Sequence, residues 1–466
     1  MNELIITLKP DEKKPLYEQI YEYIKEEIQK GDLKANTKLP STRRLANHLQ
    51  VSRSTVNLSY EQLLSEGYIY AKAGSGYYVA TIDSLLEIKE KQIESISIIK
   101  KEKENYFYDF SPRGVDLTSF PYNTWRKLSK EVLSGNYNEL FANGITQGEE
   151  NLRQAIADYL YAARGVKCHV DQIIIGAGSE YLLMLLNLII GKEAVIAMEN
   201  PTYKQAYRCF VSLGHKVVPI PLDKSGMNVE KLQESNVDIA YVMPSHQYPT
   251  GVIMPIKRRL ELLTWAGGRE ERYIIEDDYD SEFRYKGKPI PSLYGVDSNE
   301  KVIYLGTFSR SIAPAIRISY MVLPPKLLHI YQKRNSFYSS TVSRIDQEIL
   351  YHFIQDGYYE RHLNKMRATY KNKHDCILSG LEPLKPYFKI TGEHAGVHLL
   401  LESVCNKNED WLVNQAKKQG VKVYGLSTYE IEKVEKTNGT VILGYANLTE
   451  KEIEEGLSCL RNAWMI

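Results

Sequence analysis

The chain has 466 residues, of which 43% are hydrophobic, so it is long enough to form two or three domains with buried cores. Lys and Arg total 59 and Asp and Glu total 58, and this near-neutral balance gives no sign of a polyanionic partner for the chain as a whole. The cysteines are isolated from one another, which argues against a Cys-x-x-Cys metal site and against a disulfide framework: Cys168, Cys209, Cys376, Cys405 and Cys459.

Neither a signal peptide nor a membrane span is expected. Residues 1–14 are charged throughout and lack the apolar core of a signal peptide. The densest apolar run, residues 181–190, is half the length needed to cross a bilayer and is expected to form a buried helix. We therefore expect a protein of the reducing cytoplasm.

Residues 1–80 are predicted to form three helices and a β-hairpin. The first helix ends at Gly31, and the next two begin after Ser41 and Ser52, because serine is a favoured N-cap. The hairpin turns at Gly74–Gly76. The apolar positions expected on the inner faces of the first and third helices are Leu16, Ile20, Ile24 and Ile28, and then Val56, Tyr60, Leu63 and Leu64.

The tight junction at Val51–Ser52 is typical of a helix-turn-helix, whose last helix directs its first turn into the major groove of DNA. From Leu33 to Tyr60 there are five basic residues and no acidic one, a pattern that favours contact with phosphates. A three-helix bundle used only for dimerisation is the alternative. The cationic window and the glycine-tipped hairpin together favour DNA binding.

The segment PLYEQIYEYIKEEIQKGDLKANTKLPSTRRLANHLQVSRSTVNLSYEQLLSEGYI closely resembles the winged-helix domain of GntR-type bacterial regulators. The resemblance implies a DNA-binding domain over residues 1–80. It also implies that the DNA contacts are Arg43, Arg44, Arg53, Ser54, Thr55 and Asn57, with Gly76 in the wing.

Residues 81–105 are charged and contain neither glycine nor proline, and we interpret them as a linker. A surface helix is the alternative, since Ile93, Ile96 and Ile99 recur every three residues. From about residue 149, helical patterns alternate with apolar strand patterns. This alternation predicts an α/β domain over 106–466 with a mostly parallel sheet, helices on both faces and functional loops at the carboxyl ends of the strands.

Polar residues gather at those predicted strand ends. Gly178 and Ser179 open a helix, where free N–H groups favour a phosphate. The run 276–278 places three acids at the end of a buried strand, so at least one of them is expected to have a cationic or N–H partner. A phosphate cradle, a buried acid and an aromatic residue at Tyr203 are the parts that pyridoxal phosphate needs.

This domain resembles a fold-type I aminotransferase, and the whole chain is similar to the MocR/GabR family, in which a GntR-type winged helix is fused to such a domain. The resemblance implies a homodimer, pyridoxal phosphate as cofactor, operator DNA and a small amino-acid-like effector. It implies stacking by Tyr203, a contact from Asp277 to the pyridine nitrogen and one from Tyr279 to the ring hydroxyl. The implied phosphate ligands are Gly178, Ser179, Thr307, Ser309 and Arg317.

Two positions depart from the pattern or stay open. Tyr248 stands where aminotransferases carry an asparagine before proline. Arg113, in SPRGVDLTSFP, could bind a carboxylate, but a surface salt bridge is the role we expect for it.

The departure with the largest consequence is Arg310, which occupies the position of the Schiff-base lysine. A lysine there can lose its proton and act as a nucleophile, whereas a guanidinium stays charged. Three interpretations remain open: a natural regulator that binds the cofactor or a preformed cofactor–amino acid adduct non-covalently, a substitution introduced at the lysine, or a pocket adapted to another anionic ligand. We predict a transcription regulator with a catalytically impaired domain, and an aminotransferase with an accessory N-terminal domain is the alternative.

Overall fold

A computed structural model describes residues 4, 6–10, 13–81, 105–135, 137–284, 290–433 and 438–464. The chain divides into two compact units, residues 1–102 and 103–466. Most of the predicted linker, residues 82–104, lies outside the described residues. Within the described ranges, no helix combines the length and the apolar character that a membrane crossing requires.

The first unit contains three helices and a hairpin, as predicted. The two serine N-caps are confirmed, because Ser41 accepts a hydrogen bond from the N–H of Arg44 and Ser52 accepts one from the N–H of Thr55. The hairpin is antiparallel and pairs Lys72 with Gly76 at its tip. The elements are α1 (Leu16–Lys30), α2 (Thr42–Leu49), α3 (Arg53–Ser65), β1 (Ile69–Lys72) and β2 (Gly76–Val79).

The core of this unit is formed by the apolar faces of its helices. Ile20, Ile24 and Ile28 of α1 are buried, as are Val56, Tyr60 and Leu63 of α3. The prediction for Leu64 was wrong, because this side chain is 39% exposed. One residue advances a helix by about 100°, which turns position 64 away from the stripe that positions 56, 60 and 63 share.

The second unit is built on an eight-stranded sheet with the order β4-β11-β10-β9-β8-β5-β6-β7. Its central strands run parallel, while β11 is antiparallel to both of its neighbours. The mostly parallel sheet is therefore confirmed. The strands are β4 (Ile173–Gly176), β5 (Ile196–Asn200), β6 (Val217–Asp223), β7 (Gly226–Met227), β8 (Ile239–Val242), β9 (Tyr273–Asp278), β10 (Val302–Thr307) and β11 (Ser319–Val322).

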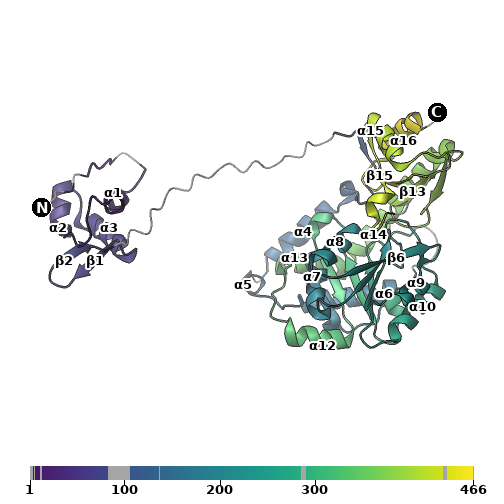
Figure 1. Cartoon of the computed structure of the whole chain (residues 1–466), viewed down its shortest axis with the longest axis horizontal. Helices are drawn as coiled ribbons and strands as arrows, with labels where there is room; N and C mark the ends of the chain where they lie inside the picture. The colour runs from purple at the N-terminus through teal and green to yellow at the C-terminus, as the bar shows by residue number, and fades with distance from the viewer. Residues whose placement is uncertain are drawn as a thin grey trace. The chain divides into compact units, whose positions relative to one another are not determined.

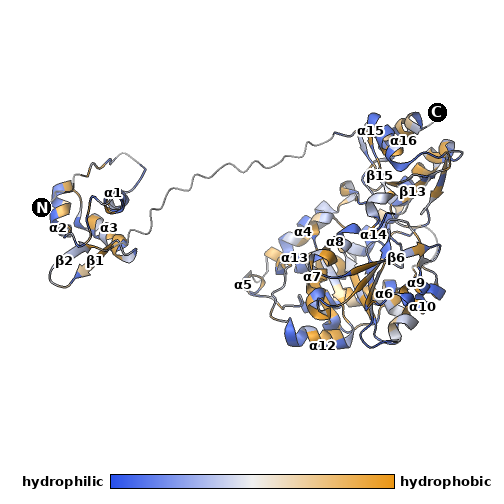
Figure 2. Ribbon diagram, in the orientation of Figure 1, coloured by the Kyte–Doolittle hydropathy of each residue, from blue (hydrophilic) through white to orange (hydrophobic). Residues whose placement is uncertain are grey.

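Helices cover both faces of this sheet (Figure 1). One face packs against α7, α8 and α12, and the other against α4, α6, α13, α9 and α10. Figure 2 shows the strands as apolar bands between helices whose outer sides are hydrophilic. The helices are α4 (Tyr122–Leu133), α6 (Glu150–Arg164), α7 (Ser179–Ile190), α8 (Lys204–Ser212), α9 (Val229–Glu234), α10 (Ile256–Gly267), α12 (Pro325–Arg334) and α13 (Arg344–Gln355).

The helix expected at the apolar run 181–190 is α7, but it is not buried all round. Leu182 and Leu186 are fully buried, whereas Met184 and Leu188 are 53% and 45% exposed. Because α7 lies on one face of the sheet, only one side of it can pack against the strands.

A second, antiparallel sheet follows in the order β12-β13-β16-β15, and its core includes residues of α14, α15 and α16. The segment that enters the unit pairs β3 (Tyr108–Asp109) in parallel with β14 (Val421–Lys422). The elements are β12 (Phe388–Thr391), β13 (His398–Ser403), β15 (Tyr424–Gly425), β16 (Thr440–Gly444), α14 (Tyr358–Leu381), α15 (Glu409–Lys418) and α16 (Glu450–Trp464).

A buried ion pair joins Asp116, in the segment through which the chain enters the second unit, to Lys373 of α14. The ammonium of Lys373 lies 2.9 Å from a carboxylate oxygen of Asp116, and both side chains are buried. We expect Lys373→Met to lower the free energy of unfolding by about 3–5 kcal/mol, because it leaves an unpaired carboxylate in the interior. Lys385→Met is the control, since Lys385 pairs with Glu382 at the surface. Denaturant unfolding measures both, and equal effects would contradict this account.

Candidate functional site

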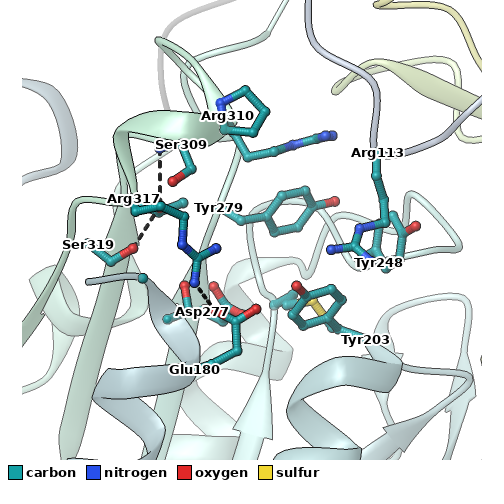
Figure 3. Close-up of a pocket in the computed structure, with 15 residues that line it drawn as sticks. Arg113, Glu180, Tyr203, Tyr248, Asp277, Tyr279, Ser309, Arg310, Arg317 and Ser319 are labelled. Atoms are coloured by element: carbon teal, nitrogen blue, oxygen red, sulfur yellow. Dashed lines mark hydrogen bonds and ion pairs between the residues drawn. The ribbon is translucent and has the colours of Figure 1, made fainter. Parts of the chain in front are cut away.

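A cavity of about 150 Å³ opens at the carboxyl ends of the central strands (Figure 3). The structure brings every residue predicted for the cofactor to its walls: Gly178, Ser179, Tyr203, Asp277, Tyr279, Thr307, Ser309, Arg310 and Arg317. The remaining wall residues are Arg113, Glu180, Met243, Tyr248, Pro314 and Ser319.

One end of the cavity is suited to a phosphate. Gly178 is the residue before α7 and has a φ of +96°. This left-handed φ favours glycine, and a Cβ atom here would meet the guanidinium of Arg317 in its present position. Arg317 also lies 2.8 Å from a carboxylate oxygen of Glu180. The helix N-terminus and the guanidinium therefore meet at one corner of the cavity, and both are groups suited to an anion.

Hydroxyl groups complete this corner. Ser319 donates to Oγ1 of Thr307 at 2.8 Å, and the N–H of Ser309 donates to the same oxygen at 3.1 Å. The hydroxyl of Ser309 is buried and has no hydrogen-bond partner among the described residues. A buried donor of this kind needs a partner, and a phosphate oxygen in the cavity would supply one.

The acid at the base of the cavity is Asp277, near the end of β9. Its carboxylate accepts a hydrogen bond from the hydroxyl of Tyr241. Burial raises the pKa of Asp277 to about 7. A protonated ring nitrogen of a ligand would stabilise the ionised carboxylate, which otherwise has a large desolvation cost.

Aromatic rings line the opposite side. Tyr248 packs edge-on against Tyr203 and Tyr279, with ring centroids 5.9 Å and 5.8 Å away. Its hydroxyl donates to that of Tyr429 at 3.2 Å. Tyr248 therefore supports the two rings, and its hydroxyl is engaged with Tyr429.

Arg310 reaches across the cavity toward the segment that enters the unit. Its Nη1 and Nη2 atoms each lie 3.2 Å from a backbone carbonyl oxygen, those of Gly114 and Pro112 respectively. None of the cavity's wall residues is a lysine. The described residues therefore offer no amine in the cavity to replace the lysine that Arg310 displaces.

The expected surface salt bridge of Arg113 is not present in the described part of the chain. Arg113 instead lines the cavity, with Cζ 5.7 Å from the ring centroid of Tyr203. The direction of the Arg113 side chain depends on the backbone path of residues 111–115, after β3. No local sequence pattern predicts that path.

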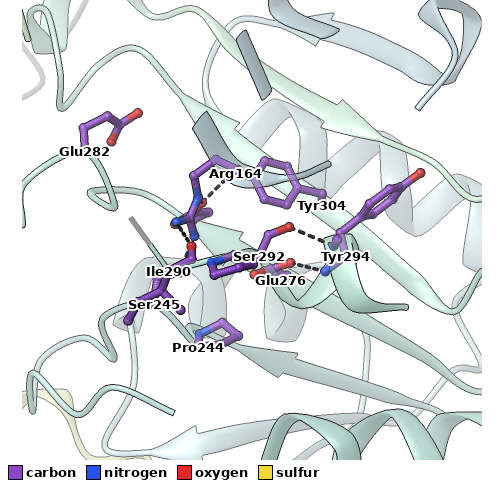
Figure 4. Close-up of polar contacts among 12 residues, drawn as sticks. Arg164, Pro244, Ser245, Glu276, Glu282, Ile290, Ser292, Tyr294 and Tyr304 are labelled. Atoms are coloured by element: carbon purple, nitrogen blue, oxygen red, sulfur yellow. Dashed lines mark hydrogen bonds and ion pairs between the residues drawn. The ribbon is translucent and has the colours of Figure 1, made fainter. Parts of the chain in front are cut away.

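A buried polar layer lies behind the cavity (Figure 4). Asp278 pairs with Nε of Arg164 at 2.8 Å. The carboxylate of Glu276 accepts hydrogen bonds from the N–H groups of Leu293 and Tyr294 at 2.7 and 2.8 Å. The expectation of cationic and N–H partners for this acidic run is confirmed, and these bonds hold the end of β9.

Sequence reasoning missed several groups around this site. Nδ1 of His246 lies 2.8 Å from Asp280 and 3.0 Å from the hydroxyl of Tyr279, which fixes that ring in the cavity wall. Glu180 follows the predicted phosphate residues directly and could have been included from its position in GAGSE. Ser319 could not have been predicted from its position, because it reaches the site through its pairing with Thr307 in the sheet.

The residues predicted to contact DNA lie at the start of two helices and at the wing. Arg43 and Arg44 are in the first turn of α2, and Gly76 begins β2. Arg53, Ser54 and Thr55 lie in the first turn of α3, and Asn57 begins its second turn. The hydroxyls of Ser54 and Thr55 lie 2.7 and 2.8 Å from that of Ser52, so both take part in the helix cap.

Both units match known families. Residues 16–79 match the bacterial regulatory proteins of the gntR family, and residues 116–460 match aminotransferase class I and II. The chain is 41% identical over 456 residues to the uncharacterised HTH-type transcriptional regulator YdeL of Bacillus subtilis, covering 97% of each chain. It is 32% identical to the probable rhizopine catabolism regulatory protein MocR of Rhizobium meliloti, covering 99% of this chain and 96% of that one. The chain belongs to the MocR/GabR family.

Two further proteins are similar to this MocR/GabR-family chain. The pyridoxine biosynthesis transcriptional regulator PdxR of Corynebacterium glutamicum is 31% identical, with 92% of this chain and 91% of PdxR covered. The kynurenine aminotransferase of Pyrococcus horikoshii, solved with PMP, has a TM-score of 0.67 and 25% identity, with 78% of this chain and 91% of that one covered. The buried hydroxyl of Ser309 and the acid at Asp277 fit the phosphate and the ring nitrogen of pyridoxal phosphate.

The raised pKa of Asp277 gives a pH-dependent stability. The unfolded carboxyl ionises near pH 3.8 and the folded one near pH 7, so the unfolded state loses its proton first and stability falls as pH rises through this window. This loss of stability amounts to about 4 kcal/mol across the window, and we expect Asp277→Asn to remove it. Urea unfolding at a series of pH values measures it. Asp158→Asn, at the surface of α6, is the control, and coincident profiles for wild type and Asp277→Asn would contradict the assignment.

Proposed function

We propose that this MocR/GabR-family protein is a DNA-binding transcription regulator. It senses pyridoxal phosphate or an amino-acid-related effector through an aminotransferase-like domain that lacks the covalent step. The observation that carries the proposal is Arg310, which stands in a cavity otherwise suited to the cofactor. The family's lysine forms a bond that a guanidinium does not form, because its nitrogen lone pairs are delocalised and its charge persists.

The cavity's residues support non-covalent binding of the cofactor. We assign the phosphate to the corner of Gly178, Ser179 and Arg317, with the hydroxyl of Ser309 as a further donor. We assign the ring nitrogen to Asp277 and one face of the ring to Tyr203. Pyridoxal phosphate supplies an aldehyde conjugated to an electron-withdrawing ring. In this chain the residues hold and orient that group, and Arg310 offers it a positive charge in place of a nucleophile.

The first unit supports DNA binding through the exposed first turn of α3. Arg53 is the first residue of this helix. Arg43 and Arg44 lie in the first turn of α2, the preceding helix. The segment from residue 33 to residue 60 contains no acidic residue. We propose a homodimer, because operators are read as paired half-sites, and a cytoplasmic location, where operator DNA is available. Residues 81–105 would then act as the linker that sets the reach of the two winged helices.

Aminotransferase activity is the second candidate, and the likeness of the second unit to the kynurenine aminotransferase favours it. It requires a nucleophilic amine in the cavity, and the cavity's wall contains arginines and no lysine among the described residues. The proposal that the domain acts as a sensor therefore depends on residue 310.

The DNA-binding proposal predicts the effect of Arg53→Ala. We expect this variant to bind an operator fragment selected from random duplexes roughly 10- to 100-fold more weakly, since a cation at the groove is lost. A gel shift at fixed salt measures the affinity. Lys30→Ala, on the acidic first helix, is the control, and circular dichroism checks folding. Unchanged affinity in Arg53→Ala would contradict the assigned DNA face.

The non-covalent proposal predicts a gain of function in Arg310→Lys. After incubation with pyridoxal phosphate and reduction with borohydride, mass spectrometry of peptides should find a label at position 310 in this variant only. The introduced amine can add to the aldehyde with loss of water, whereas the guanidinium cannot. Arg310→Gln is the matched control. Turnover of an amino acid by the wild-type protein, or a labelled cavity lysine in it, would restore the enzyme interpretation.

A further inference from the structure

Two arginines lie at the part of the cavity away from Ser319 and Arg317 (Figure 3). Cζ of Arg113 is 5.7 Å from the ring centroid of Tyr203, and Cζ of Arg310 is 5.9 Å from that of Tyr279. Both tyrosine rings line the cavity. The two guanidinium groups therefore lie beside the part of the cavity that the far end of a bound cofactor ring would reach.

The arginines of the cavity wall differ in their ion pairs within the described part of the chain. Of the three arginines in the cavity wall, only Arg317 has an acidic partner among the described residues, which is Glu180 at 2.8 Å. Arg113 and Arg310 form no ion pair with a described Asp or Glu. Cations that have no ion pair in a concave site favour an anionic ligand.

Arg310 also contacts the backbone on both sides of Arg113. Its two bonds go to the carbonyls of Pro112 and Gly114, the residues on either side of Arg113. The same segment is held at one end by the N–H of Gly444, which donates to the carbonyl of Phe110 at 2.9 Å. Arg310 therefore fastens the middle of this short segment, with the side chain of Arg113 directed to the cavity.

We propose that Arg113 binds a carboxylate of the ligand and that Arg310 is its positioning residue. The ligand then carries two separated anions, a phosphate at the Arg317 end and a carboxylate at the Arg113 end. Pyridoxal phosphate alone has no carboxylate, whereas a phosphopyridoxyl derivative of an amino acid has both groups. This inference rests on the proposed function, because it assumes that the phosphopyridoxyl part occupies the cavity.

A pair of stable probes tests the carboxylate subsite. N-(5′-phosphopyridoxyl)-L-alanine and N-(5′-phosphopyridoxyl)-isopropylamine differ only by a carboxylate in place of a methyl group, and neither reacts covalently. Isothermal titration calorimetry on the full chain should show the alanine compound binding at least about tenfold more tightly, as a charge-assisted pair in a partly enclosed site requires.

Variants separate the roles of the arginines. Arg113→Gln should abolish most of the preference and leave the affinity for the isopropylamine compound within about threefold. Arg317→Gln should weaken both compounds alike. Arg310→Gln should reduce the preference, and the double variant Arg113→Gln/Arg310→Gln should lose no more of it than Arg113→Gln alone, because Arg310 acts through Arg113. Arg126→Gln, at an exposed residue outside the cavity, is the control.

The outcomes are distinct. Equal binding of both compounds by the wild-type protein, or a preference that persists in Arg113→Gln, would overturn the carboxylate subsite and leave the cofactor-binding proposal intact. Additive losses in the double variant would overturn the positioning role of Arg310. If neither compound binds, the proposed function fails, and the subsite fails with it.

Discussion

The candidate site depends on strands that end at a common edge of one sheet. Parallel strands β9 and β10 are in register so that Asp277 pairs with Leu305, which places the acid beside the strand that leads to Thr307. The antiparallel strand β11 begins at Ser319, opposite Thr307, and its other neighbour, β4, pairs Gly176 with Ser319. Three loops far apart in the sequence therefore meet at one corner, and their polar groups form a single anion-binding surface.

Side chains alternate between the two faces of a strand, so the three acids at 276–278 do not all have the same role. Glu276 and Asp278 point to one face of the sheet, where backbone N–H groups and Arg164 neutralise them. Asp277 points to the other face and into the cavity. The buried layer stabilises the end of β9, and the acid that has no cationic partner there is the one available to a ligand.

A single side chain, Arg310, carries the proposal that this domain lacks the covalent step. An amine at position 310 permits a covalent bond with the cofactor. The guanidinium of Arg310 instead donates hydrogen bonds to the carbonyls of Pro112 and Gly114. It thereby connects the cavity to the segment through which the chain enters the second unit. Through these two bonds Arg310 contacts the backbone on either side of Arg113, the other arginine at this end of the cavity.

The resemblance to aminotransferases indicated the principal residues of the cavity wall. The sequence alone determined the two-unit organisation, the helix caps of the first unit and the mostly parallel sheet. These features depend on local rules: serine at helix starts, hydrophobic periodicity, and polar residues that follow buried strands. Tertiary structure alone decided the exposure of Leu64, the partnership of Ser319 with Thr307 and the direction of Arg113. Each of these depends on which residues distant in the chain become neighbours, and strand register and loop path set that choice.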